Sequence, residues 1–233
     1  MRTRLVWTVA TLVTVSLLNA DTAFAQQTLN FSLGYFTVRG EDARVEGDVL
    51  IEDRELFLFD FSDFNTMSIG GEWLAPLGDY FEAGAGIGLT TRGVDTIYDE
   101  FVRPDGTEIE QELKLRIIPI TGTVRLLPLG RHNAFQPYVG GGIGIFNWRY
   151  SETGDFIDFT LPGRPIFRES YVNSGTTLGP VAVFGARFVG GRGTIGGEIR
   201  WQKADGDLDE NDFLGPKIDL GGFHYVVTFG VRF

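Results

Sequence analysis

Few side chains of this protein are of the types that carry out catalysis. Cysteine is absent, and the only histidines are His132 and His224. His224 lies in an alternating segment in which Val226 and Thr228 follow it on the same face. A histidine acts as a general base when a nucleophile lies within hydrogen-bond reach, and Val226, two residues further on, supplies no hydroxyl. We therefore predict no enzyme and no cofactor, and we expect His224 to hydrogen-bond to its neighbours.

A larger set of ionisable residues falls on the less apolar faces of alternating segments that come from at least five parts of the chain. These residues are Glu72, Glu82, Arg125, Arg187, Glu198, Arg200 and Arg232, together with His224. Charges that point into a protein must be paired. We predict an ion-pair network that fills a narrow interior, and the alternative is a gated channel lined by the same residues.

Asp205, Asp207, Asp209 and Asp212 have the spacing of a calcium loop. The EF-hand needs glycine where Glu210 stands and glutamate where Pro216 stands, so that motif fails. The four aspartates stay weak candidates for a looser site that takes divalent cations, and the alternative is a solvated acidic loop.

The amino terminus has the pattern of a secretory signal. A short basic segment precedes an apolar run over 5–18, and the small residues of the Ala23-Phe24-Ala25 sequence follow. We expect residues 1–25 to be removed and the mature chain, 26–233, to form one domain. Glycine and charged residues interrupt every later apolar run, so any membrane span must consist of strands in a closed barrel.

The charge balance excludes one class of partner. The first 25 residues hold two arginines and one aspartate, so the rest carries 18 basic and 30 acidic residues, a net charge of −12. Nucleic acid demands a basic surface, and we predict no nucleic-acid partner.

The last segment, 223–233, alternates without a break between apolar residues and others. About ten such residues span an outer membrane as a barrel strand, and the alternative is the edge strand of a soluble sandwich. The export signal favours the membrane. We expect Phe229, Val231 and Phe233 to form the assembly signal that the barrel assembly machinery reads.

Seven further alternating segments precede this one, which predicts an eight-stranded antiparallel barrel. The segments lie at 29–35, 66–73, 81–89, 113–126, 137–150, 178–188, 195–202 and 223–233. A ten-stranded barrel is the alternative, although the pieces at 45–51 and 55–62 are short for spanning strands.

For two of the segments, the sequence does not decide which side chains face the lipid. In 113–126 the apolar phase changes, which predicts either a bulge near Pro119 or outward Lys114 and Arg116 above the hydrocarbon, within reach of lipid phosphates. In 137–150 both phases are apolar. Pro119 and Pro180 cannot donate to a strand ladder, and each is expected at a bulge or a local opening.

The connections alternate in length. Those at 76–79, 128–136 and 190–193 are short, whereas those at 40–63, 92–112, 151–172 and 203–218 are long and hold 25 of the 30 acidic residues. Short turns inside and long loops outside are typical of an outer-membrane barrel with periplasmic termini. We expect the stretches at 56–61 and 156–167 to form hairpins that continue the barrel wall.

Four stretches resemble small outer-membrane barrels of the OmpW-like and OmpA-transmembrane-like superfamily. They are Ile118-Pro119-Ile120, Val124-Arg125-Leu126, Phe135-Gln136-Pro137-Tyr138-Val139-Gly140-Gly141-Gly142-Ile143-Gly144 and Thr228-Phe229-Gly230-Val231-Arg232-Phe233. The resemblance covers most of the mature chain in layout and these stretches in residues. It implies a narrow, partly apolar lumen that passes small hydrophobic molecules, without the peptidoglycan-binding domain of OmpA-like proteins.

From these observations we expect a porin-like passive channel for small hydrophobic solutes in the outer membrane, where lipid and lipopolysaccharide surround it. The alternative function is a structural or surface-interaction barrel with a plugged lumen and acidic loops that bind cations or other partners.

Overall fold

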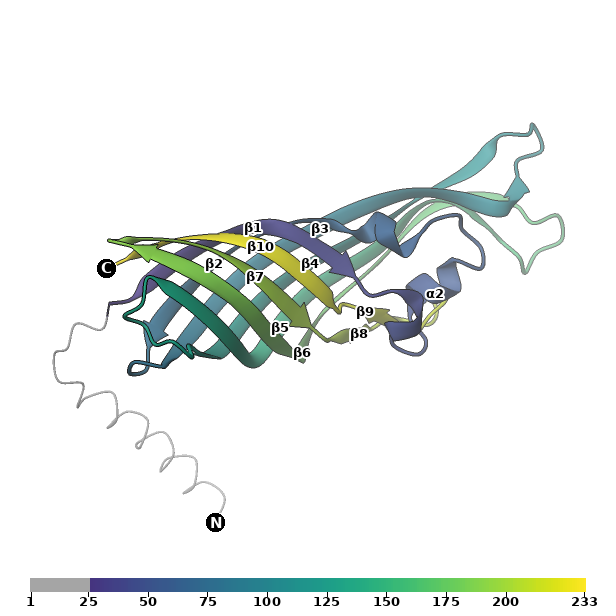
Figure 1. The fold of residues 1–233 in the computed structure, drawn as a ribbon. Coiled ribbons are helices and arrows are strands. Elements are labelled where there is room, and N and C mark those ends of the chain that lie inside the picture. The colour runs from purple at the N-terminus through teal and green to yellow at the C-terminus, as the bar shows by residue number, and fades with distance from the viewer. Residues whose placement is uncertain (1–25) are drawn as a thin grey trace, which may run out of the picture.

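The computed structural model describes residues 26–233, which form a closed antiparallel β-barrel of eight strands (Figure 1). The strands follow the circular order β1-β10-β7-β6-β5-β4-β3-β2. Their bounds are β1 Thr28–Val38, β2 Thr66–Pro76, β3 Phe81–Val102, β4 Glu108–Leu126, β5 Phe135–Ile157, β6 Ile166–Gly190, β7 Gly193–Gln202 and β10 Gly222–Arg232. The eight-stranded prediction is confirmed, and the expected signal peptide lies outside the described residues.

The ring closes between the first and last long strands. β1 and β10 pair without a register shift from Thr28 with Arg232 to Val38 with Gly222. Smaller elements lie in two connections at the opposite end from residue 28. They are the 3₁₀ helices η1 Glu41–Ala43 and η2 Phe61–Phe64, the helix α2 Val49–Asp53, and the paired strands β8 Asp205–Asp207 and β9 Lys217–Asp219. Within 26–233, every helix is too short or too polar to cross a membrane.

Alternation of side chains gives an apolar outer face to the half of the barrel nearer Thr28. Side chains at every second position point outward and are exposed, because successive side chains of a strand lie on opposite faces. Examples from each strand are Phe31, Ile69, Ile87, Val124, Ile143, Phe184, Ile199 and Phe229. A closed ladder with an apolar outer band is the organisation of a membrane-spanning barrel.

Strand β4 keeps a single phase along its whole length. Leu113, Leu115 and Ile117 are buried inside, and Lys114 and Arg116 face outward above the apolar band. Pairing of β3 with β4 stops after Ile87 with Ile120 and resumes at Thr90 with Ile117 in the same register. The missing donor of Pro119 therefore produces a local opening and no bulge.

Pro180 lies where the ladder to β7 ends, because the first pair between β6 and β7 joins Val181 to Gln202. The missing N–H therefore interrupts no pair on that side.

Strand β5 turns its aromatic side chains inward. Tyr138, Phe146, Trp148 and Tyr150 are buried, whereas Val139, Ile143 and Ile145 are exposed on the outer face.

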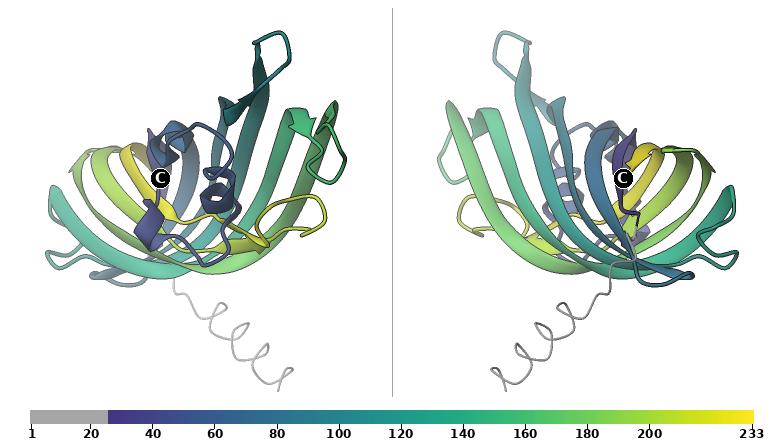
Figure 2. Two further views of the ribbon diagram at one scale, coloured as in Figure 1. Left: turned by 90° about the vertical axis from the view of Figure 1, so that its right-hand side faces the viewer. Right: turned by 90° about the vertical axis from the view of Figure 1, so that its left-hand side faces the viewer.

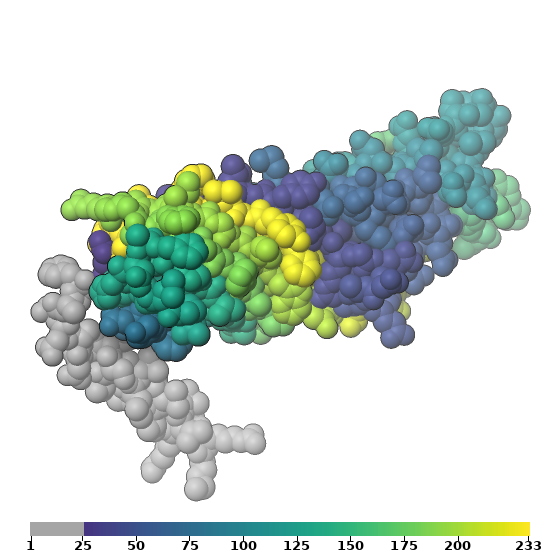
Figure 3. All heavy atoms as spheres, viewed as in Figure 1, coloured from purple at the N-terminus to yellow at the C-terminus, as the bar shows by residue number. Residues whose placement is uncertain are grey.

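The four central strands extend far beyond the others. β3, β4, β5 and β6 contain 22, 19, 23 and 25 residues, whereas β1, β2, β7 and β10 contain 10 or 11. Their two hairpins project from the outer end of the barrel (Figures 1 and 3). The segments 92–112 and 151–172, expected as long loops, are thus mostly strand. The hairpin expected at 156–167 forms, with Ile157 paired to Ile166.

The hairpin expected at 56–61 does not form, and this prediction is wrong. Phe57, Phe59, Phe61 and Phe64 are buried, and only an isolated bridge joins Phe57 to Tyr98. The alternation of aromatic residues here reflects packing inside the barrel mouth, where burial on the existing sheet stabilises the chain without a new strand.

Candidate functional site

The inner half of the lumen contains a lumen network formed by Glu72, Glu82, Arg125, Arg187, Glu198 and Arg200. Alternation on β2, β3, β4, β6 and β7 turns these side chains inward. Three arginines face three glutamates, so the network is neutral as a set.

Arg125 lies at the centre of the network and is 1% exposed. Its Nη2 atom lies 2.5 Å from Glu72 Oε2 and 2.8 Å from Glu198 Oε2. The guanidinium carbon lies 4.6 Å from the ring centroid of Tyr138, whose hydroxyl donates to Glu198 at 3.0 Å. One arginine therefore joins β4, β2 and β7 across the lumen, and Tyr138 adds β5.

The other two arginines complete the set. Arg187 binds Glu82 through two hydrogen bonds of 2.8 and 2.7 Å, and its Nε donates to Gln136 at 2.8 Å. Arg200 donates to Glu198 at 2.7 Å. Bidentate arginine–carboxylate contacts of this kind fix geometry as well as charge.

His224 and Arg232 stand apart from the ion pairs. His224 Nε2 lies 3.1 Å from Gln202 Oε1, and the ring lies 4.5 Å from that of Phe36. Within 26–233, Arg232 makes none of the ion pairs. His132 lies in an exposed turn, 3.0 Å from Asp79. The structure thus brings together six of the eight expected lumen residues as ion pairs and places His224 in contact with Gln202 and Phe36, directly opposite Arg200 of β7.

Glycine on β3 makes room for the network. A Cβ atom built at Gly84 would lie 2.8 Å from Glu72 Oε1 and 2.6 Å from Thr123 Oγ1. A larger residue there would displace the glutamate that Arg125 binds.

The outer half of the lumen is filled by apolar side chains. Val49 and Leu50 of α2 are fully buried, and they belong to one cluster with Phe36, Leu113 and Trp148 of the barrel wall. We call this cluster the outer core. Figure 2 shows the connection that carries α2 lying across the ring of strands. The inner half of the lumen is therefore filled by ion pairs, and the outer half is filled by packed apolar side chains.

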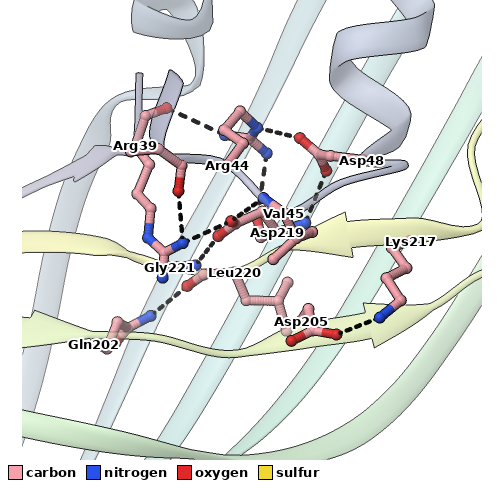
Figure 4. A network of polar contacts seen from close by, with 11 residues as sticks. Arg39, Arg44, Val45, Asp48, Gln202, Asp205, Lys217, Asp219, Leu220 and Gly221 are labelled. Carbon is pink, nitrogen blue, oxygen red and sulfur yellow. Dashed lines mark hydrogen bonds and ion pairs between the residues drawn. The ribbon is translucent and has the colours of Figure 1, made fainter. Parts of the chain in front are cut away.

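One buried ion pair and several hydrogen bonds attach the α2 connection to β9 (Figure 4). Asp219 accepts from Arg39 Nη1 at 3.0 Å and from the Val45 N–H at 2.9 Å. Asp48 pairs with Arg44 and accepts from the Asp219 N–H at 2.8 Å. Because Asp48 and Asp219 are almost completely buried, these contacts hold the connection in one position.

Two buried carboxyls lie beside α2 above the apolar band. Asp53 accepts from the Tyr150 hydroxyl at 2.8 Å, and Glu152 lies two residues further along β5 on the same inner face. Burial raises the pKa of Asp53 well above its ordinary value, and burial raises the pKa of Glu152 to about 7. Within the described residues, Asp53 Oδ1 and Glu152 Oε1 have no hydrogen-bond partner.

The expected calcium ligands do not converge. Asp205 Oδ2 lies 3.3 Å from Lys217 Nζ, and Asp209 accepts from the backbone and side chain of Asn211. No group of three or more acidic or histidine side chains in 26–233 is arranged to hold a metal ion. The weak prediction of a site at Asp205, Asp207, Asp209 and Asp212 therefore finds no matching geometry.

Sequence reasoning missed several residues of the interior. Tyr138 and Gln136 join the lumen network from a strand whose facing was open, and α2 was read as part of a loop. The available signal was the run Val49-Leu50-Ile51, which is too apolar for a connection exposed to solvent.

Comparison with known proteins gives a likeness of fold. No family model matches the chain, and no curated protein matches it. One similar fold is the crystal structure of Ail, the attachment invasion locus protein of Yersinia pestis, in complex with the heparin analogue sucrose octasulfate. Its sequence is 13% identical to this chain, the TM-score is 0.44, and the match covers 89% of this chain and 99% of that one. The crystal structure of neisserial surface protein A has 10% identity and a TM-score of 0.45, covering 90% and 97%. Such distant likeness carries no argument about ligands.

Proposed function

We propose that this protein is a bacterial outer-membrane barrel with a closed lumen, which acts without catalysis at the external surface. The observation that supports this proposal is the filling of the lumen at two levels. Arg125 is 1% exposed in the inner half, and Leu50 is fully buried in the outer half. An eight-stranded barrel is narrow enough for side chains to fill it.

The distribution of charge favours the outer end as the working surface. The acidic connections and long hairpins lie at the end opposite to the start of β1, Thr28, and the end of β10, Arg232 (Figure 1). Exposed acidic side chains at that end include Glu41, Asp42, Asp99, Glu108 and Glu210. Partners of this end would therefore carry positive charge.

A basic cluster on the outer wall fits the phosphates of lipopolysaccharide. Arg116 of β4 stands directly opposite Arg149 of β5, and Lys114 lies one position further on the same face of β4. Like charges placed opposite each other on a sheet repel, and an anion between them removes that repulsion. The cluster lies just above the apolar band, where lipid phosphates lie.

The test of the closed lumen is electrical. The folded barrel, identified by a gel migration that changes on boiling, is inserted into a planar bilayer beside a conducting porin as positive control. We expect no discrete openings from this protein. Discrete openings of the folded barrel would refute the closed lumen and would support the porin-like alternative.

A second candidate function, a lateral route for small hydrophobic solutes, is supported by the opening at Pro119. A small internal cavity of about 20 Å³, lined by Pro119, Gly88 and His224, lies behind an apolar groove on the outer wall that also borders Gly88. The two spaces share Ile69 and Ile87 of the wall. This is the function that the OmpW-like resemblance implies.

The lateral route has its own test. Pro119→Val restores the missing donor and allows the β3–β4 ladder to close. If solutes pass through this opening, the uptake of naphthalene by vesicles that contain the barrel falls in the variant. Equal uptake by both proteins, or by vesicles without protein, removes this candidate.

A further inference from the structure

The outer end of the barrel contains a pocket of about 270 Å³ that no part of the proposed function uses. Its walls come from the α2 connection, β3, β5, β6 and the segment between β8 and β9. We call it the aromatic pocket, and the residues that define it here are Phe57, Tyr98, Glu152, Phe156, Tyr171 and Phe213. Because five separate segments meet there, the pocket is a product of the tertiary fold.

The rings around the pocket are packed against one another in several orientations. Phe57 and Tyr98 meet edge to face with centroids 4.8 Å apart, and Phe156 and Tyr171 do so at 5.0 Å. Tyr171 also contacts Phe213 at 6.5 Å. Such contacts hold the rings in place, and the π-faces of aromatic rings attract cations.

The charge of the lining has one sign. Three of the lining residues are acidic, Glu152, Glu210 and Asp212, and none is a lysine or an arginine. Glu152 is 3% exposed at the inner end, where its carboxyl adjoins that of Asp53, and its Oε1 atom has no amide, hydroxyl or cationic donor among the described residues. Glu210 and Asp212 are exposed at the mouth. A buried carboxylate oxygen without a donor is a place for a ligand that supplies one.

We propose that the aromatic pocket binds a small organic cation, namely a primary ammonium group on an aromatic or apolar body, with Glu152 as its counter-ion. The volume lies below the range of about 300–1,000 Å³ that is usual for small-molecule sites, so the ligand is a compact amine. The aromatic rings enclose the apolar body, and Glu210 and Asp212 attract the cation to the mouth.

Contacts between a cation and aromatic rings already occur at the edge of the pocket. The guanidinium carbon of Arg164 lies 5.4 Å from the ring centroid of Phe101 and 5.5 Å from that of Phe159. Phe159 is also one of the residues that line the pocket. The aromatic residues of this region thus bind a cation of the chain itself.

The protonation of Glu152 sets the pH dependence of binding. Its titratable neighbours are Asp53 on α2, Tyr98 on β3 and Tyr150 on β5, with Tyr171 on β6 and the two acids at the mouth. Burial raises the pKa of Glu152 to about 7. An ammonium ion binds the ionised carboxylate, so we expect affinity to increase as the pH rises from 6 to 8.

The experiment uses the folded barrel in phosphatidylcholine nanodiscs, with empty nanodiscs as the blank. Isothermal titration compares 2-phenylethylammonium with neutral 2-phenylethanol and anionic 3-phenylpropionate, which have similar bodies. We expect saturable binding of the ammonium compound, at least tenfold weaker binding of the alcohol and none of the acid. Equal affinity for the ammonium compound and the alcohol would overturn the proposal.

Variants locate the site. Glu152→Gln keeps the shape and removes the charge, and we expect at least a tenfold loss of affinity and loss of the pH dependence. Glu100→Gln, at an exposed acid of β3 outside the pocket, should bind as the unaltered protein does. Tyr171→Leu, at a half-buried ring, gives a second reading if Glu152→Gln does not fold. Unchanged binding by Glu152→Gln or by Tyr171→Leu would refute the site.

A further arm separates a free amine from a protein-borne one. Nα-acetyl-lysine amide carries the ammonium group of a partner's lysine on an aliphatic stem. Tighter binding of 2-phenylethylammonium supports a free small amine. Binding of the lysine derivative alone would overturn that assignment. Because these readings are independent of conductance, failure here leaves the test of the closed lumen intact.

Discussion

Arg125 gives the sharpest test of how the lumen is stabilised. Its guanidinium is 1% exposed and neutralises Glu72 and Glu198 at 2.5 and 2.8 Å. Arg125→Met keeps most of the volume and leaves Glu72 with Arg200 alone, at 3.8 Å, whereas Glu198 keeps Arg200 at 2.7 Å. Removal of one member of a buried ion pair costs about 3–5 kcal/mol, and the lost contact with the Tyr138 ring adds about 0.5–2 kcal/mol. We expect the free energy of unfolding to fall by about 4–6 kcal/mol, the sum of these terms reduced for overlap.

The assay is reversible guanidinium unfolding in phospholipid vesicles, followed by tryptophan fluorescence. The double variant Arg125→Met, Glu72→Gln removes one cation and one carboxylate and leaves Glu198 paired with Arg200 at 2.7 Å. Neutral replacement of a buried ion-pair group is often close to neutral in energy, so we expect most of the stability to return. Arg168→Met is the control, since Arg168 lies 3.5 Å from Asp155 with its side chain 75% exposed.

Two results would refute this reasoning. A loss below about 1 kcal/mol in Arg125→Met would mean that water reaches the glutamates, because only solvation could replace the arginine at that cost. A double variant as unstable as the single one would mean that Arg125 acts through packing and not through charge.

Three further predictions concern packing and pH. Leu50→Ala, at a fully buried residue of α2, should lower the free energy of unfolding by about 2–5 kcal/mol in the same assay, and a loss no larger than that of an exposed Leu214→Ala would contradict the outer core. Gly142→Ala should abolish the heat-dependent gel shift of the folded barrel, because its Cβ would overlap the Gly122 carbonyl, whereas Gly122→Ala, with open space around it, should fold normally. The folded state raises the pKa of Glu152 from 4.5 to about 7, so the protonated carboxyl stabilises the fold fully below pH 4.5 and this stabilisation is lost as the pH rises through about 7. The raised pKa of Asp53 acts in the same direction, so Glu152→Gln should reduce, and not abolish, the fall in unfolding free energy across that interval, and an unchanged profile would contradict the raised pKa of Glu152.

The barrel itself could be predicted from the sequence because its signal is repeated. Six of the eight spanning strands alternate clearly, and the need for a closed ring supplies the other two. The inward charges could be found in the same way, since the position of Arg125 relative to Val124 fixes its side. What alternation does not contain is the pairing between strands, so the contact of Arg125 with both Glu72 and Glu198 needed the three-dimensional structure.

The outer half was harder to predict for a physical reason. Above the membrane a strand has water on its outer side, so polar side chains such as Lys114 point outward and apolar ones such as Leu113 point inward. The apparent change of phase at Pro119 is this change of solvent, and the strand itself continues without a bulge. The α2 connection was misread because its alternating phenylalanines fit a strand as well as they fit a buried turn.

The length of the four long strands sets how far the protein extends beyond the membrane surface. The 25 residues of β6 extend over about 80 Å, or about 60 Å along the axis at the usual tilt of a barrel strand. The apolar band needs about 25 Å of this height, so the tips of the hairpins reach roughly 30 Å past the hydrocarbon, among the sugars of the outer leaflet. The long strands therefore block access to the outer end of the barrel from one side, and the end is open on the other side, above β2, β1, β10 and β7. Molecules therefore reach this surface preferentially from the side of the short strands.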